Sequence, residues 1–301
     1  MSSERHIRAG VLFAFGAYVW WGLIPIYFKQ VQAADATEII VHRLVWTLVC
    51  MTIIVVLTGR GPNLGAALRN RKTIAALALS GGCIAVNWLI FVWAVTHGRV
   101  HDTSLGYFIN PLLFVFLGLV VLRERLRRMQ ILALLLAAAG VAQFMAQVGV
   151  FPWIALSLAT TFGIYGLVRK QVNVDAFVGL FIETLLVSPL AIGYFAWLAA
   201  NGANSFGPAQ PGFSALLMLA GPVTATPLVM FATGARRINM TTLGFLQYVA
   251  PTMTFLLAVL VYGETFSQAK LITFICVWVA LVVYSADSVR NAQRAQRSQA
   301  A

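Results

Sequence analysis

Residues 103–128 read TSLGYFINPLLFVFLGLVVLRERLRR, an apolar run that ends in a cluster of arginines. An α-helix rises about 1.5 Å per residue, so about 20 residues cross a hydrocarbon core of about 30 Å. The apolar part of this run, residues 103–122, has that length. Arginines beside a transmembrane helix mark its cytoplasmic end. The stretch therefore predicts one membrane crossing and also its direction.

Runs of the same kind recur along the chain, and we expect ten transmembrane spans. They cover roughly 10–29, 38–58, 73–96, 103–122, 128–147, 150–168, 176–198, 213–235, 241–262 and 270–287. Of the 301 residues, 60% are hydrophobic and 10% are charged, whereas soluble domains carry about 25% charged residues. So few charges could not cover the surface of a water-soluble protein of this size. The predicted fold class is an all-α membrane protein.

The basic residues between the spans crowd into every second gap. Lys29, Arg99 and Lys270 lie on one side, and Arg43 lies inside a span. The other 17 of the 21 fall on the opposite side: Arg5, Arg8, Arg60, Arg69, Arg71, Lys72, Arg123, Arg125, Arg127, Arg128, Arg169, Lys170, Arg236, Arg237, Arg290, Arg294 and Arg297. Both termini are therefore expected in the cytoplasm. The net charge of +12 is spread over short loops, which argues against nucleic-acid binding.

The two halves of the chain resemble each other. Pro111 is followed 13 residues later by Glu124, and Pro251 is followed 13 residues later by Glu264, so the offset between the pairs is 140. Upstream, the sequence SLGY at 104–107 resembles TLGF at 242–245, with a slip of two residues. Five spans per half is an odd number, so the second copy must insert upside down.

The expected architecture is two inverted five-helix repeats, at residues 10–149 and 150–288. A cytoplasmic segment, 1–9, precedes them, and a disordered cytoplasmic tail, 289–301, follows. Inverted repeats are typical of secondary transporters, in which the substrate site lies near the midplane between the copies.

Two charges inside the spans are candidates for function, because burying a charge in the bilayer costs about 2.5–3.5 kcal/mol or more. Glu183 stands opposite His42 and Arg43 when the repeats are aligned. We expect Arg43 to hold an anionic group, or to pair with Glu183 when the pathway is empty, and Glu183 to be the candidate for proton coupling. Alternatively, Arg43 extends to the headgroups and Glu183 makes a structural hydrogen bond.

His42 follows Glu38 by four residues, so the two side chains can share one helix face. His42 could titrate near neutral pH at the pathway, or it could stay neutral and bond a helix neighbour. His97 and His101 flank an outer loop beside Asp102, but a metal site would need another well-placed ligand, so no metal is predicted.

Three prolines are expected to kink helices at the pathway: Pro25, Pro111 and Pro251. Tyr107 and Asn110 share a face one turn apart. Their counterparts in the second half include Gln247 and Tyr248, and we expect both proline-containing helices to face one central cavity. The alternative is a packing kink with bonded polar side chains.

Aromatic residues with a few amides are expected to line this cavity, namely Trp20, Asn87 and Trp88. Such walls suit a flat organic solute. Packing against lipid or core is the alternative for each tryptophan.

Known catalytic and nucleotide motifs are absent from the sequence. It contains no GxxxxGK[ST], no HExxH and no GxSxG. The three cysteines lie inside apolar runs without metal spacing, so no disulfide framework is implied. An enzyme is not expected, and neither is a cofactor.

Four motifs together resemble the RarD branch of the EamA transporters, in the drug/metabolite transporter superfamily. They are WGLIPIYFK at 21–29, ExxxHR at 38–43, SLGYFINPL at 104–112 and LQYVAPT at 246–252. The resemblance extends from about residue 8 to 288. It implies ten helices in two inverted halves around a central cavity, a bacterial inner membrane, and solute permeation or export. Members are named for chloramphenicol sensitivity, a label that establishes no physiological substrate.

The predicted function is secondary active transport of a small organic metabolite or drug-like solute by alternating access, with proton coupling as one option. The alternatives are an uncoupled facilitator of the same solutes and, in another class, a membrane-embedded enzyme or sensor. The expected partners are the solute and the lipid bilayer. The solute, the direction of transport, the coupling ion and the oligomeric state stay open.

Overall fold

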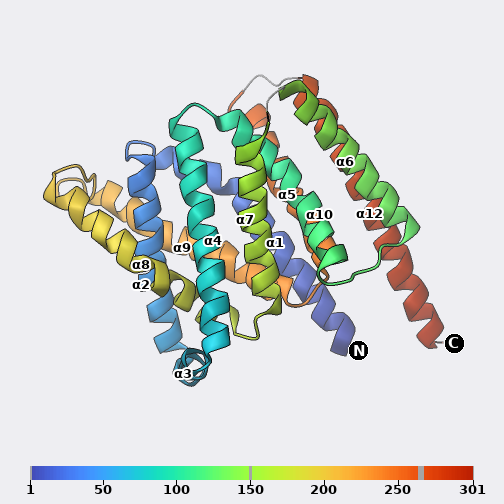
Figure 1. The fold of residues 1–301 in the computed structure, drawn as a ribbon, viewed down its shortest axis with the longest axis horizontal. Helices are drawn as coiled ribbons and strands as arrows, with labels where there is room; N and C mark the ends of the chain where they lie inside the picture. Colours follow the sequence, from blue (N-terminus) through green and yellow to red (C-terminus); the bar gives the residue numbers. More distant parts are fainter. Residues whose placement is uncertain (1, 149–150, 264–267, 301) are drawn as a thin grey trace.

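The computed structural model describes residues 2–148, 151–263 and 268–300, and in these residues the chain folds into helices joined by short loops (Figure 1). The helices are α1 (Ser2–Gln30), α2 (Ala36–Leu57), α3 (Gly61–Arg69), α4 (Arg71–Thr96), α5 (Val100–Val120), α6 (Arg128–Val148), α7 (Trp153–Gln171), α8 (Ala176–Ala200), α9 (Pro211–Ala235), α10 (Met240–Gln247), α11 (Val249–Leu256), the π-helix η1 (Leu257–Val261) and α12 (Gln268–Ala300). Glu264, one of the repeat markers, lies outside the described residues.

Ten segments have the length of a membrane span. Nine in the described ranges are both long and apolar enough to cross a bilayer, with α10, α11 and η1 counted as one span. The tenth is α7, which has 19 residues and carries Arg169 and Lys170 in its last turn. The all-α ten-span fold predicted from the sequence is confirmed.

The packing of the helices repeats between the two halves. The neighbours of each helix correspond when the two halves are matched in chain order. The matched pairs are α1 with α7, α2 with α8, α4 with α9, α5 with α10–η1, and α6 with α12. The α2–α9 contact is matched by α8–α4, the α1–α9 contact by α7–α4, and the α5–α7 contact by α1–α11. Three pairs, α2–α8, α5–α10 and α6–α12, each join a helix to its own counterpart. This is the pattern of two inverted copies related by a pseudo-twofold axis.

One hydrogen bond marks where the two copies meet at the crossing of α5 and α10. The Tyr248 hydroxyl donates to the Phe108 carbonyl oxygen (3.3 Å), and these residues are 140 positions apart, the same offset as the repeat. Pro251 has no N–H to donate to the carbonyl of Gln247 four residues earlier. The helix is interrupted at that place, because α10 ends at Gln247 and α11 begins at Val249. Pro111, in contrast, lies inside a continuous α5.

The repeat marker Glu124 has a structural explanation. Its carboxylate accepts hydrogen bonds from the backbone N–H of Met240 (2.6 Å) and of Thr241 (2.9 Å), and from the Thr241 hydroxyl (2.6 Å). An anion is favourable at a helix N-terminus, where N–H groups lack partners. Glu124 therefore ties the loop between α5 and α6 in the first half to the start of α10 in the second.

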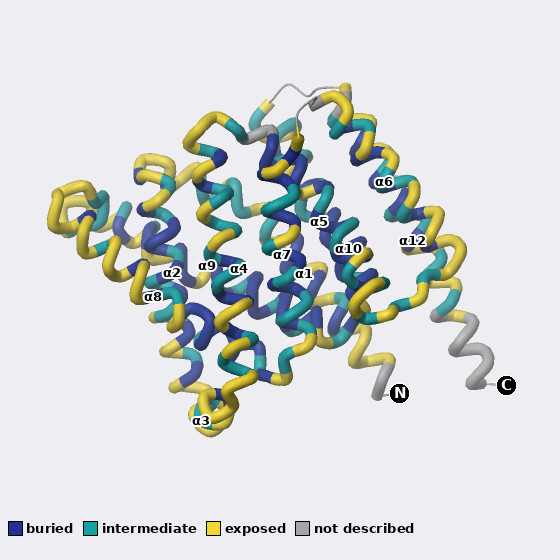
Figure 2. Tube along the Cα trace, in the orientation of Figure 1, coloured by how far each residue is buried: buried dark blue, intermediate teal, exposed yellow. Residues whose placement is uncertain are grey.

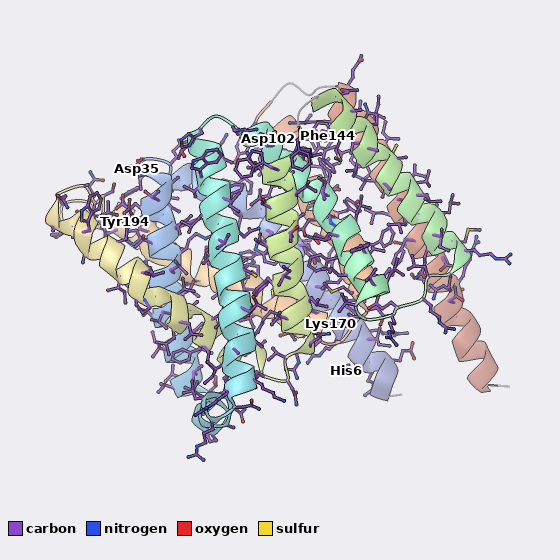
Figure 3. The ribbon with its side chains drawn as sticks, in the orientation of Figure 1. His6, Asp35, Asp102, Phe144, Lys170 and Tyr194 are labelled. Atoms are coloured by element: carbon purple, nitrogen blue, oxygen red, sulfur yellow. The ribbon has the colours of Figure 1, made fainter. Side chains whose placement is uncertain are left out.

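Both termini lie at the same end of the bundle (Figure 1), as an even number of crossings requires. Figure 3 shows His6 and Lys170 at that end, and Asp35 and Asp102 at the opposite end. Lys170 holds α7 against the end of α9, because its ammonium donates to the Ala235 carbonyl oxygen (3.0 Å). Cations suit a helix C-terminus, where carbonyls are unpaired.

The ends of the chain differ from the prediction. Helix α1 already begins at Ser2 and includes most of segment 1–9. The tail 289–301, predicted to be disordered, is helical as far as Ala300, because α12 continues through it. Alanine, glutamine and arginine favour helix, so a helix that packing has started can extend through them. The short helix α3 was also missed by the sequence analysis.

Buried residues gather where the helices of both halves meet, and exposed residues cover the outside (Figure 2). Many exposed residues are large and apolar, such as Leu190 at 80% and Leu260 at 75% exposure. A soluble protein would not leave such an extensive apolar surface in water, whereas lipid tails solvate it.

Helices α2 and α9 approach very closely at Gly221. A Cβ atom on this glycine would lie 2.4 Å from the Trp46 carbonyl oxygen, and the Thr47 hydroxyl donates to the Gly221 carbonyl oxygen (3.3 Å). Small residues allow such backbone approach between membrane helices. This contact positions Arg43 of α2 against Thr224 of α9.

We expect Gly221→Ala to destabilise the protein by about 1–3 kcal/mol, because the added methyl group must push two backbones apart. Thermal unfolding in detergent measures the effect. Gly193→Ala is the matched control, because a Cβ there meets nothing within 4 Å. Equal melting temperatures for Gly221→Ala and wild type would contradict the close packing.

Candidate functional site

Arg43 lies at the meeting point of five helices. Its Nε donates to the Thr224 hydroxyl of α9 (3.0 Å). The guanidinium carbon lies 4.1 Å from the ring centroid of Trp88 on α4 and 5.6 Å from that of Phe28 on α1. The Tyr107 hydroxyl on α5 is near enough to interact electrostatically with it. Thr224 and aromatic rings therefore hold the cation in place.

No carboxylate balances the charge of Arg43 in the part of the chain that the structure describes. Its two terminal nitrogens have no hydrogen-bond partner there, and Arg43 is partly exposed. Tyr107 beside it is 49% exposed, although it lies seven residues inside a membrane helix. An accessible cation within the bilayer needs an anion or water, so this place can hold a negatively charged group.

Glu183 lies on α8 and is 2% exposed. Its Oε1 is 3.6 Å from Nε of Arg169, a residue of α7 that is 1% exposed, and it accepts a hydrogen bond from the Ser80 hydroxyl of α4. The predicted pair between Glu183 and Arg43 is therefore wrong for this structure. Arg169 is the partner because its side chain extends from the last turn of α7 to the first turns of α8.

Gly179 makes room for the Arg169 side chain. A Cβ at this position would lie 1.9 Å from Nη1 of Arg169. The guanidinium also donates from Nη2 to the Ala176 carbonyl oxygen (3.1 Å) in the first turn of α8. A glycine one turn before Glu183 thus allows a cation to enter a fully packed helix interface.

Four polar atoms of this cluster have no hydrogen-bond partner among the described residues: Oε2 of Glu183, Nε and Nη1 of Arg169, and the Tyr165 hydroxyl. A cavity of about 10 Å³ is lined by Glu183, Tyr165 and Trp88. That volume suits one water molecule, and the unpartnered polar atoms could bind it. Trp88 also covers the guanidinium of Arg43, so its ring separates the two charged clusters.

The two charged clusters occupy equivalent places in the two repeats. Arg43 corresponds to Glu183, Lys29 corresponds to Arg169, and both offsets are 140. Accessibility differs sharply between the copies, because Tyr107 is 49% exposed and its counterpart Gln247 is 6% exposed. At these two equivalent positions the first repeat is therefore exposed and the second is buried.

Of the other predicted cavity residues, two bond neighbouring helices. Trp20 is 40% exposed, and its Nε1 donates to the Val223 carbonyl oxygen (3.0 Å), one residue from Thr224. Asn87 joins α4 to α7, because its Nδ2 donates to the Leu158 carbonyl oxygen (2.8 Å) and to the Thr161 hydroxyl (2.9 Å).

Asn110 and Gln247 are buried beside the crossing of α5 and α10, and Tyr248 bonds across it. The amide oxygens Oδ1 of Asn110 and Oε1 of Gln247 have no partner among the described residues. These three residues therefore lie buried at the crossing of α5 and α10.

His42 faces away from the Arg43 cluster. Its Nδ1 accepts a hydrogen bond from Nε1 of Trp46 (3.0 Å), and its ring packs against Phe195 and Phe206. Nε2 lies 3.7 Å from Oε1 of Glu38. Glu38 in turn accepts hydrogen bonds from the N–H and the hydroxyl of Ser205 (2.6 and 3.0 Å). His42 thus belongs to the anchor of the loop between α8 and α9.

Pro25 lies inside α1, which continues through it to Gln30. One turn before it, the Gly22 carbonyl oxygen accepts a hydrogen bond from the Thr254 hydroxyl of α11 (3.3 Å). The proline thus stands where α1 packs against the second half.

The comparisons with known proteins agree with this architecture. Residues 8–145 match the EamA-like transporter family. An "uncharacterized transporter" of Vibrio cholerae is 42% identical and covers 98% of each chain. The chain belongs to the EamA-like transporter family. Protein RarD of Escherichia coli is 40% identical over 97% of this chain and 99% of its own, so the predicted membership of the RarD branch is confirmed.

A solved structure supports the fold of this EamA-family chain. It has a TM-score of 0.70 with 18% sequence identity, and the match covers 92% of this chain and 96% of the other. This likeness supports the fold, and the family and its relatives identify the protein as a multi-pass membrane transporter.

Sequence reasoning missed Arg169, Ser80, Tyr165, Phe28 and Thr224. The repeat contained a signal for one of them: Arg169 precedes Glu183 by 14 residues, as Lys29 precedes Arg43. Arg169 was counted with the loop cations because it lies in the last turn of its helix, next to Lys170.

We expect Arg169→Met to destabilise the protein by about 3–5 kcal/mol, because it leaves the Glu183 charge buried without a partner. Adding Glu183→Gln should restore most of that loss, and melting temperatures in detergent measure both variants. Arg99→Met is the control, because it removes a partly exposed pair with Asp102, of the kind that contributes little. If the losses of stability from the two substitutions simply add in the double variant, Arg169 and Glu183 do not interact.

Proposed function

We propose that the protein is a secondary active transporter that moves a small organic solute by alternating access. The observation that carries this proposal is the unequal exposure of Tyr107 and Gln247, two residues at equivalent places of inverted repeats. The first half of the pathway is open, and the second half is closed. If the two repeats exchange conformations, the open and the closed ends exchange as well.

The closed end is held by the cluster of Ser80, Arg169 and Glu183, which joins α4, α7 and α8. In the opposite state we expect this cluster to separate and the surroundings of Arg43 to close. The solute binds near Arg43, between the two halves, and is exposed to each side in turn.

Proton coupling through Glu183 follows from the same cluster. Protonation would remove the charge that attracts Arg169, and so weaken the contact that closes this end. A group whose protonated form favours one of two conformations links proton binding to the change of state. The unpartnered Oε2 and the water-sized cavity beside it provide a place to receive the proton.

The orientation rests on the basic residues. The sequence assigns seventeen of the 21 to the side of the termini, and this excess supports cytoplasmic termini in a bacterial inner membrane. The open end then faces away from the cytoplasm. Export would therefore load solute in the opposite state and release it in the state seen here.

The runner-up is a facilitator without ion coupling, in which Glu183 and Arg169 only pack helices. Solute flux would then follow the solute gradient at any pH. A membrane-embedded enzyme or sensor would release a product or engage a signalling partner, without net solute movement.

Accessibility from the outside tests the open state. In a chain without Cys50, Cys83 and Cys276, we expect Tyr107→Cys to react in intact cells with a membrane-impermeant maleimide. Gln247→Cys should stay protected, because its site is 6% exposed. Labelling after membrane disruption with denaturant controls for expression. Equal labelling of both sites, or labelling of Gln247→Cys alone, would contradict the assigned orientation.

Proteoliposomes loaded with a pH-sensitive dye test the coupling. Single metabolites are added from a panel, and the wild type should show a proton flux that depends on the solute. Glu183→Gln should lose this flux and retain exchange of the same labelled solute, because an amide still bonds Ser80. Glu38→Gln, a buried carboxylate at the other end, should keep the flux. If the Glu183→Gln variant moves protons as the wild type does, coupling through Glu183 is rejected and the facilitator is the remaining transport model.

A further inference from the structure

We propose that the Arg43 site selects flat, monoanionic carboxylates, a substrate class that rests on the proposed transport function. The charge balance is the first argument. Arg43 contributes one positive charge in the bilayer, and no described carboxylate lies within ion-pair distance of it. A monoanion neutralises that charge, whereas a cationic solute would be repelled and a dianion would leave a net charge in a medium that solvates it poorly.

The free edge of the guanidinium is the second argument. Nε is occupied by Thr224, and the face of the group lies against Trp88 at 4.1 Å. The two terminal nitrogens remain accessible and unbonded. These nitrogens donate along one edge in a plane, which matches the two oxygens of a carboxylate. The bound carboxylate would thus lie in the plane that Thr224 and Trp88 set.

The walls are the third argument. Phe28, Trp88 and Tyr107 surround the guanidinium, and Tyr107 exposes half of its side chain. The Tyr27 hydroxyl is already engaged, because it donates to the Leu216 carbonyl oxygen (3.0 Å). Such a lining has few free polar groups for a sugar or a phosphate ester, and it offers rings on which a flat body can stack. We infer that the body of the solute is aromatic or otherwise planar and apolar.

Two neighbours of Arg43 set the selectivity of the site, and a lysine at position 43 could not use them in the same way. Thr224 positions the guanidinium, and Trp88 fixes its plane. Lysine at position 43 would keep the charge, but it would lose the bond through Nε and the two parallel donors. Arg43→Lys should therefore bind a carboxylate more weakly than the wild type and more tightly than Arg43→Gln.

Isothermal titration of the purified full chain in detergent with benzoate and with benzamide tests the proposal, because the two probes share size and shape and differ in charge. Wild type should bind benzoate at least tenfold more tightly than benzamide. Arg43→Gln should abolish this preference, and Trp88→Ala should weaken both probes. Arg99→Gln, which removes another cation at the open end, should leave both affinities within twofold of wild type.

Three results would overturn the proposal: equal affinity for the two probes, a benzoate affinity unchanged in Arg43→Gln, or no benzoate binding at millimolar concentration. Melting temperatures show whether each variant is folded, and Arg43→Lys keeps the test valid if Arg43→Gln unfolds. The transport assay is independent of this measurement. If benzoate binds as expected but no solute flux is found, the proposed function is rejected and the binding site is retained. If flux is found but benzoate and benzamide bind equally well, only the preference for carboxylates is rejected.

Discussion

The ion pair of Glu183 with Arg169 is the contact on which the closed end of the molecule depends. It is buried between α7 and α8, Ser80 of α4 bonds the same carboxylate, and each charge would be costly without the other. The equivalent place in the first repeat holds Arg43. No carboxylate among the described residues forms an ion pair with it, and it is partly exposed. Two inverted copies with nearly the same backbone thus carry opposite electrostatics. In the second repeat the buried charge is paired within the protein, and in the first repeat we propose that the solute provides the anion.

This asymmetry explains how a symmetric scaffold can have a direction. Inverted repeats with identical side chains would favour both states equally, because exchanging the copies changes nothing. Here the second half satisfies its charge internally, through Gly179, which admits Arg169. The first half satisfies its charge with the aromatic ring of Trp88 and with the solute that we propose. Under the proposed mechanism, the free-energy difference between the two states depends on both the bound solute and the protonation of Glu183.

The backbone packing provides the rigid frame for these charges. Gly221 brings α9 against Trp46 of α2, and Glu124 caps α10 from the other half. The helix break before Pro251 stands at the crossing of the two copies, beside the bond of Tyr248 to Phe108. Where the helices break and cross, few backbone hydrogen bonds oppose movement, so this crossing is the natural place for the halves to change their relative positions.

The sequence by itself predicted the ten spans, the side on which each loop lies and the inverted repeat, because hydrophobic length and loop charge are local properties that decide how a segment enters a bilayer. It also singled out Arg43 and Glu183, since a charge within an apolar run is conspicuous. Only the tertiary structure decided that Glu183 pairs with Arg169, that His42 belongs to the anchor of the loop between α8 and α9, and that Tyr107 is exposed where its counterpart Gln247 is buried. In lipid most faces of a helix are apolar, so periodicity does not show which face meets which neighbour, and the partners of a buried charge emerge only from the packing.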